Sequence, residues 1–168
     1  MTTAHPSIVD ALKQALGSFQ RPIEEWTADQ RQALEEYQAT SFLCIRELDR
    51  GDKSIFYFGG GLDHLIQLFS RIFFCGRLRN VLYRPCTMLL DSENCYGQAR
   101  KYGRPGEVAE VSILIDVEHP VRKNDTTLSQ SVFGTLLHGC VHAYFMTAGC
   151  SGDPATTMCE DESCHEIW

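Results

Sequence analysis

An α+β domain is the fold class that the sequence predicts, and three segments carry this prediction. Residues 62–74 place apolar side chains along one stripe at helical spacing, which is typical of an amphipathic helix. Residues 110–117 are almost continuously apolar and β-branched, which is typical of a buried strand. Residues 127–147 again show helical spacing, with an apolar face wide enough for a helix that is buried on most sides.

The composition fits a single globular domain. Of the 168 residues, 43% are hydrophobic and 22% are charged, which excludes wholesale disorder and allows one sizeable core. No segment approaches the ~18 consecutive apolar residues of a membrane span. The first residues also lack the basic and apolar regions of a secretory signal. We therefore expect a soluble intracellular protein, cytoplasmic or nuclear, without membrane contact.

The N-terminal part of the chain is predicted to be mainly helical. Residues 7–16 have the spacing of a short amphipathic helix that Gly17 ends. Thr27 is followed three residues later by Gln30, the pattern of a capping box, which predicts a helix through about residue 39.

The pattern of residues 41–57 is mixed. Residues 54–58 are predicted to form a strand before the glycine triplet at 59–61. This triplet lacks the spacing and the lysine of a phosphate-binding loop, so we interpret it as a turn. Residues 1–59 are accordingly treated as an N-terminal helical extension of unassigned role.

After the helix at 62–74 the chain is predicted to become strand-like. Residues 81–83 and 87–90 are the next candidate strands, and residues 91–105 are polar and read as a loop. The strand at 110–117 is followed by a loop containing Pro120.

The last predicted helix carries the most informative feature of the chain. Thr127 and Gln130 form a second capping-box pattern at its start. His138 and His142 lie four residues apart, which places them on one helical face about 6 Å apart, a spacing that suits one metal ion. In the H-E-x-x-H zinc site the residue after the first histidine is a glutamate that serves as general base, but here it is Gly139. The metal-binding half of the motif is therefore present, the proton-transfer half is missing, and the catalytic residue is unknown.

Cysteines form a second set of candidate ligands. The chain contains eight: Cys44, Cys75, Cys86, Cys95, Cys140, Cys150, Cys159 and Cys164. Because no secretory signal is evident, reduced cysteines are favoured, and clusters of them suggest metal binding. The apolar surroundings of the first three predict small buried side chains. The last three follow the histidine pair closely, so either metal binding or a disulfide is open to them.

The charge is unevenly distributed along the sequence. The formal net charge is −7, which argues against strong non-specific binding to nucleic acid or anionic lipid. Residues 71–104 nevertheless hold seven basic side chains against two acidic ones, a local charge of +5. This segment could contact a polyanion weakly, or it could be a solvated face balanced by acidic neighbours.

Three stretches of the sequence resemble the SprT-like zinc metalloprotease family, whose DNA-repair members include Spartan. The family's aromatic pair followed by a small residue, glycine, a basic residue and leucine is similar to residues 73–78. Its strand before the site helix is similar to residues 111–117. Its signature L-L-H-E-x-x-H-A-Y is similar to residues 136–144 at every fixed position except Gly139.

The resemblance implies a zincin-like SprT domain over residues 60–168. Such a domain has several helices on a small three- to four-stranded sheet and a buried helix that carries the metal site. The family's third ligand is a histidine followed three residues later by an aromatic residue, which His165 and Trp168 match, although the usual flanking glycines are absent. By resemblance, Zn²⁺ would be bound by His138, His142 and His165.

Three functions are consistent with these observations. The first is a zinc-binding protein of the SprT-like fold without its general base, either a pseudo-protease or an enzyme with a diverged zinc-dependent reaction. The second is an active metalloprotease in which Gly139 is engineered or compensated. The third is a non-catalytic binding module with structural zinc. The partner, a small molecule or a protein, is not identified, and Gly139 is expected to leave a pocket beside the metal.

Overall fold

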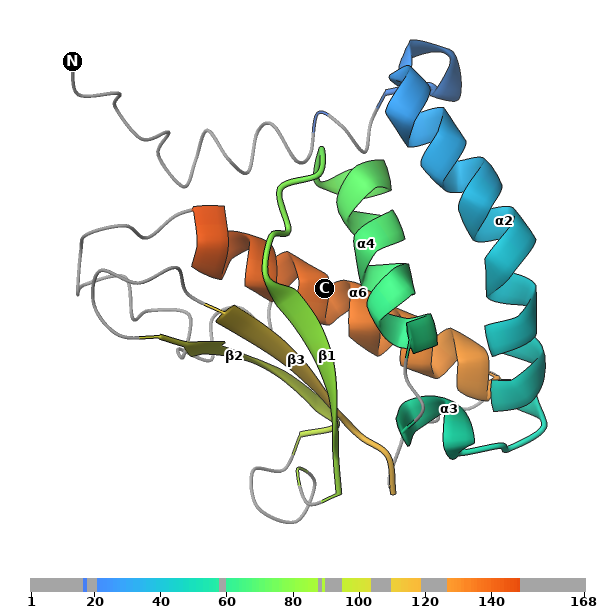
Figure 1. Cartoon of the computed structure of the whole chain (residues 1–168), viewed down its shortest axis with the longest axis vertical. Coiled ribbons are helices and arrows are strands. Elements are labelled where there is room, and N and C mark those ends of the chain that lie inside the picture. Colours follow the sequence, from blue (N-terminus) through green and yellow to red (C-terminus); the bar gives the residue numbers. More distant parts are fainter. Residues whose placement is uncertain are drawn as a thin grey trace.

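The computed structural model confirms an α+β fold. It describes residues 17, 21–57, 60–87, 89, 95–103, 110–118 and 127–148. The elements within this part of the chain are η1 (Ile23–Glu25), α2 (Ala28–Asp49), α3 (Ser54–Tyr57), α4 (Gly60–Phe73), β1 (Val81–Cys86), β2 (Gly97–Tyr102), β3 (Glu110–Asp116) and α6 (Leu128–Ala148). Helices α4 and α6 pack on the three-stranded sheet, and α2 packs in turn against both of them (Figure 1).

The sheet is built around β3. Its strand order is β1-β3-β2, with β1 parallel and β2 antiparallel to the central strand. Every residue of β3 after Glu110 is buried, which confirms the strand predicted at 110–117. Val111, Ile113 and Ile115 alternate with the intervening residues and therefore share one face. Tyr83 of β1 and Ala99 of β2 lie directly opposite Ile113 and extend that face across the sheet.

Strand β2 lies within the polar loop that the sequence predicted at 91–105, so that prediction was wrong over residues 97–102. Residues 91–94, 104 and 105 lie outside the described residues. The strand is at one edge of the sheet, and none of its side chains is fully buried. An edge strand of this kind is held by its backbone hydrogen bonds to β3. It does not need the alternation of apolar and polar residues by which a strand packed on the core is recognised in a sequence. The first predicted strand, 81–83, is confirmed and runs on to Cys86, while Thr87 and Leu89 are not in a strand.

Helix α2 begins as predicted but ends much later. The Thr27 side chain accepts a hydrogen bond from the Gln30 N–H at 3.1 Å, and the Thr27 N–H donates to Gln30 Oε1 at 3.0 Å, which confirms the capping box. The helix does not stop near residue 39 but continues to Asp49. Its second half is retained because Ser41 and Leu48 are buried, and Leu48 belongs to the same hydrophobic core as α4 and α6.

The strand predicted at 54–58 is also wrong over the residues that can be described. Ser54–Tyr57 form the short helix α3, with the Ser54 N–H donating to Asp52 Oδ1 at 2.8 Å and Phe56 fully buried. The predicted turn at 59–61 is wrong in part, because Gly60 and Gly61 are the first residues of α4. The predicted helix at 7–16 lies outside the described residues.

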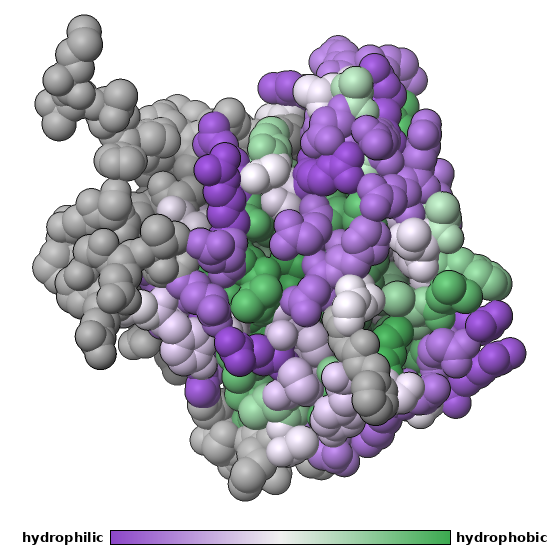
Figure 2. All heavy atoms as spheres, in the orientation of Figure 1, coloured by the Kyte–Doolittle hydropathy of each residue, from purple (hydrophilic) through white to green (hydrophobic). Residues whose placement is uncertain are grey.

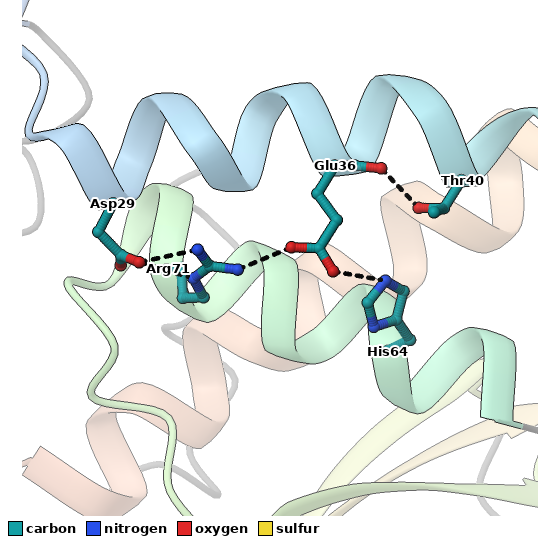
Figure 3. Close-up of polar contacts among 5 residues, drawn as sticks. All are labelled: Asp29, Glu36, Thr40, His64 and Arg71. Carbon is teal, nitrogen blue, oxygen red and sulfur yellow. Dashed lines mark hydrogen bonds and ion pairs between the residues drawn. The ribbon is translucent and has the colours of Figure 1, made fainter.

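A layer of charged side chains holds α2 against α4 (Figure 3). Arg71 of α4 pairs with Asp29 at 2.8 Å and with Glu36 at 2.9 Å, both on α2. The other oxygen of Glu36 lies 3.4 Å from His64 Nε2. On the buried side of the same interface, Gln30 donates to the Ile72 carbonyl at 2.9 Å. In the view of Figure 2, hydrophilic side chains cover the first half of α2. In its second half two large apolar side chains, Phe42 and Leu43, are exposed.

The positions of the cysteines are only partly as predicted. Cys44 and Cys86 are half-buried, whereas Cys75 is exposed, so its predicted burial was wrong. Cys75 lies two residues after the end of α4 and has φ 53°. The next residue, Gly76, has φ 70°, and its N–H donates to the Ser70 carbonyl at 2.9 Å. The chain turns away from the helix here in a C-terminal cap, which leaves the side chain in solvent. Among the helices that can be described, none is long and apolar enough to span a membrane.

The carboxylate of Asp49 links the end of α2 to the start of α6, and we expect its removal to destabilise the protein at neutral pH. Its Oδ1 accepts the Ser129 N–H at 3.0 Å, and this hydrogen bond lowers the pKa of Asp49 below its ordinary value. A carboxyl group whose pKa is lower in the folded than in the unfolded protein stabilises the folded state at pH values above its unfolded pKa, about 3.9 for Asp. That stabilisation is lost as the pH falls through the pKa of the folded state.

Asp49→Asn should therefore lower Tm relative to wild type at pH 7, and the difference should shrink as the pH is taken below about 4. Glu35→Gln removes a charge from an exposed position of the same helix and serves as the control. A Tm difference for Asp49→Asn that is the same at pH 7 and at pH 2.5, or no larger than that of the control, would contradict the proposed linkage.

Candidate metal centre on helix α6

Helix α6 is anchored at its start and buried along its length. The Thr127 N–H donates to Gln130 Oε1 at 2.9 Å, and the Gln130 N–H donates to Thr127 Oγ1 at 3.3 Å, so the second predicted capping box is confirmed. Leu136, Cys140 and Ala143 have no exposed surface, and the helix packs against β2 and β3 on one side and α2 and α4 on another. The helix predicted at 127–147 is therefore confirmed as a buried central element.

His138 and His142 come together as their spacing predicts. Both are half-buried, their Nε2 atoms are 2.8 Å apart and their ring centroids are 4.6 Å apart. This separation suits a hydrogen bond between two neutral imidazoles, in which one Nε2–H donates and the other Nε2 accepts. Zinc bound tetrahedrally at the usual distances of about 2.0–2.1 Å would place two ligand nitrogens about 3.3 Å apart. The two nitrogens would therefore have to lie about 0.5 Å farther apart than they do here to share a zinc ion.

A metal site with three protein ligands would need one more side chain beside this histidine pair. Within the part of the chain that the structure describes, no group of three or more His, Cys, Asp or Glu side chains is arranged to hold a metal ion. His165, Cys150, Cys159 and Cys164 lie outside the described residues, so their predicted roles stay predictions. Cys140 lies in the core, where burial raises the pKa of its thiol to about 12, which keeps it neutral at physiological pH.

Gly139 faces the sheet, and the space beside it is occupied by Ile113. A Cβ atom built on this residue would lie 2.5 Å from Ile113 Cγ2, and 3.4 Å from Cγ1 and Cδ1 of the same side chain. The expected pocket beside the metal is therefore wrong, because Ile113 of β3 occupies the space that a side chain at 139 would need. The glycine permits α6 to approach β3 closely, which compensates for its unfavourable helix propensity.

A second close approach lies one helical turn earlier and joins α6 to β2. A Cβ atom on Gly97 would lie 2.4 Å from Thr135 Cγ2 and 3.2 Å from the Leu114 carbonyl oxygen. Thr135 Oγ1 donates to the Ser131 carbonyl at 2.9 Å, which fixes the rotamer that directs its methyl group at the strand. Sequence reasoning missed this contact because Gly97 was assigned to a loop. The small residues at 97 and 99 in an otherwise polar stretch were the only available signal.

The basic segment 71–104 is partly neutralised by the fold. Arg71 is paired with two carboxylates of α2, and Arg84 contacts Glu110 at 2.7 Å and donates to Ser112 Oγ at 2.9 Å. Lys101 on β2 donates to the Met146 carbonyl in the last turn of α6 at 3.2 Å, a favourable place for a cation. The positive charge that this segment can offer to a polyanion is therefore smaller than its sequence indicates.

Comparisons of the chain with protein-family models, with curated proteins and with solved structures found no significant match.

Alanine substitutions at two glycines of α6 should have opposite effects on stability. Gly134 is exposed, and a Cβ atom there would meet no atom within 4 Å, so Gly134→Ala should raise the free energy of unfolding by up to about 1 kcal/mol. Gly139→Ala forces a methyl group against Ile113, and such overpacking typically costs about 1–3 kcal/mol, which exceeds the gain in helix propensity. Urea denaturation of both variants measures the contrast. Stabilisation by both would mean that α6 does not press on β3 at residue 139.

Proposed function

We propose that this protein binds one Zn²⁺ ion through His138, His142 and His165 on a domain of SprT-like, zincin type, and that it lacks the protease activity of that family. The observation that carries the proposal is the 2.8 Å separation of the two Nε2 atoms on a central, buried helix. Supporting features are the confirmed helix and strand at the two best matching stretches, 136–144 and 111–117. When bound, zinc would supply a Lewis acid and lower the pKa of a ligated water.

The packing around Gly139 supports the proposal that this protein works without the glutamate base of zinc proteases. In a zinc protease that base takes a proton from the metal-bound water and delivers it to the leaving amine. Here a carboxylate side chain at 139 would have to displace Ile113, which has no exposed surface. The fit between this glycine and Ile113 argues that residue 139 is adapted to its packing, which disfavours a recent loss of an active-site glutamate. The remaining candidates are a pseudo-protease, an enzyme with a diverged zinc-dependent reaction and a non-catalytic binding module with structural zinc.

We expect the purified protein to contain about one zinc per chain, measured by elemental analysis after dialysis. The His138→Ala/His142→Ala double variant should lose the metal, because two of three ligands are removed, and His165→Ala should bind it more weakly. His64→Ala is the matched control, since His64 lies on α4 and contacts Glu36. Wild type without stoichiometric zinc, or a double variant with unchanged zinc content, would refute the metal site.

We also expect no general protease activity, and no gain of activity in Gly139→Glu. Loss of a positioned acid–base group lowers rates by about 10²–10⁴-fold, and the new side chain has no room beside Ile113. Zinc-loaded wild type and variant are to be tested on casein, with circular dichroism and thermal melts to report folding. Zinc-dependent cleavage by wild type, or strong activation by Gly139→Glu, would instead support the metalloprotease alternative.

A further inference from the structure

We propose that the protein forms a symmetric dimer in which strand β2 pairs with β2 of a second copy, so that two three-stranded sheets become one sheet of six strands. The proposal does not depend on the zinc site. It rests on the difference between the two edges of the sheet and on the side-chain pattern of β2.

The edge formed by β1 is largely closed to a further strand. Its even-numbered residues bond to β3, as in the hydrogen bond from the Val111 N–H to the Asn80 carbonyl at 3.0 Å, so the backbone groups of the odd-numbered residues point away from the sheet. Among these, the Tyr83 N–H donates to Asp63 Oδ1 at 2.7 Å, and Pro85 has no N–H to offer. Proline and coverage by another element are usual means by which an edge strand is kept from pairing.

The edge formed by β2, at the opposite margin of the sheet in Figure 1, has no such protection. The Asp116 N–H donates to the Tyr96 carbonyl at 2.8 Å, so the even-numbered residues of β2 pair with β3 and the odd-numbered ones direct their backbone groups outward. Those of Gly97, Ala99 and Lys101 have no hydrogen-bond partner within the described residues. A proline-free strand with unpaired donors and acceptors along one side is a template for another strand.

The side chains of β2 are complementary to a second, antiparallel copy of the strand. A register with Ala99 opposite its own copy joins the outward backbone groups of one strand to those of the other. On the outer face of the sheet it sets Tyr96 opposite Tyr102 of the second copy. These two side chains are 40% and 46% exposed in the single chain, and aromatic pairs across strands stabilise a sheet.

The charges of β2 fit the same register. Arg100 lies opposite Gln98 of the second copy, and within one chain these two side chains already form a hydrogen bond. Lys101 lies opposite Gly97 of the second copy, and its ammonium group is bound on the helix side to the Met146 carbonyl at 3.2 Å, so it does not block the edge. A register moved by two residues would either set Arg100 opposite its own copy or separate the tyrosine pairs.

Sedimentation velocity under reducing conditions, over a wide range of protein concentrations, measures the association. Wild type should be a reversible dimer. Ala99→Pro removes the central outward N–H without breaking a bond to β3, as Pro85 does in β1, and should be monomeric. Circular dichroism and thermal melts report whether this variant folds; if it does not, the charge substitutions below decide.

Two substitutions at Gln98 test the register without proline. Gln98→Glu places an acidic group opposite Arg100 of the second copy, and Gln98→Lys places a basic one there, twice in each symmetric dimer. The dimer dissociation constant should fall for the first and rise for the second, each by roughly 2- to 30-fold. Leu82→Glu and Leu82→Lys are the matched controls, because Leu82 is exposed on the same face of the sheet but belongs to β1. Neither control should change the association.

Amide hydrogen exchange locates the contact. Raising the protein concentration should slow exchange at Gly97, Ala99 and Lys101, and should leave Val81 on the opposite edge unchanged. A protein that stays monomeric up to its highest soluble concentration would overturn the proposal. A dimer in which the Gln98 variants behave like their Leu82 controls would also overturn it, because the contact would then lie on another surface.

Discussion

The close contact of α6 with β3 at Gly139 is the constraint on which the rest of the structure depends. A helix with a side chain at this position could not reach the sheet without displacing Ile113, which lies at the centre of β3. Since α6 also packs against α2 and α4, its depth affects how both of these helices pack on it. The cost of glycine in a helix, about 1 kcal/mol, is offset by the burial that this approach allows.

Polar contacts between separate elements surround this central packing of α6 on β3. Asp49 receives the Ser129 N–H, so the end of α2 caps the start of α6. Asp63 in the first turn of α4 accepts the Tyr83 N–H at 2.7 Å and thereby occupies a backbone donor of the edge strand β1. Arg71 then ties α4 to α2. These links arise between elements distant in the sequence and orient the helices around the apolar core.

The sequence was informative where a local rule governs the structure. Both capping boxes, at Thr27 and Thr127, are satisfied by the predicted reciprocal hydrogen bonds, and the spacing of His138 and His142 correctly placed their side chains together. Prediction from the sequence failed where tertiary contacts determine the secondary structure. The second half of α2 is held by a few buried residues, and β2 is a polar edge strand held by backbone pairing.

The role of Gly139 is also decided by tertiary contacts. In the sequence, Gly139 stands where the H-E-x-x-H motif has its catalytic glutamate, so the missing glutamate was interpreted as an empty pocket beside a metal. Only the position of Ile113, which comes from a strand far away in the sequence, reveals that this place is filled. From the sequence alone, a glycine that replaces a lost catalytic side chain looks the same as a glycine that allows a close packing contact.

X-ray absorption spectroscopy of the zinc-loaded protein tests the central claim most directly, because it identifies the atoms bound to the metal. The account predicts only nitrogen and oxygen ligands at about 2.0–2.1 Å, with the multiple-scattering signal of imidazole, and loss of this signal in the His138→Ala/His142→Ala variant. A sulfur shell at about 2.3 Å would instead show that cysteines close the site and that the zinc is structural, which would contradict the proposed open, three-histidine centre.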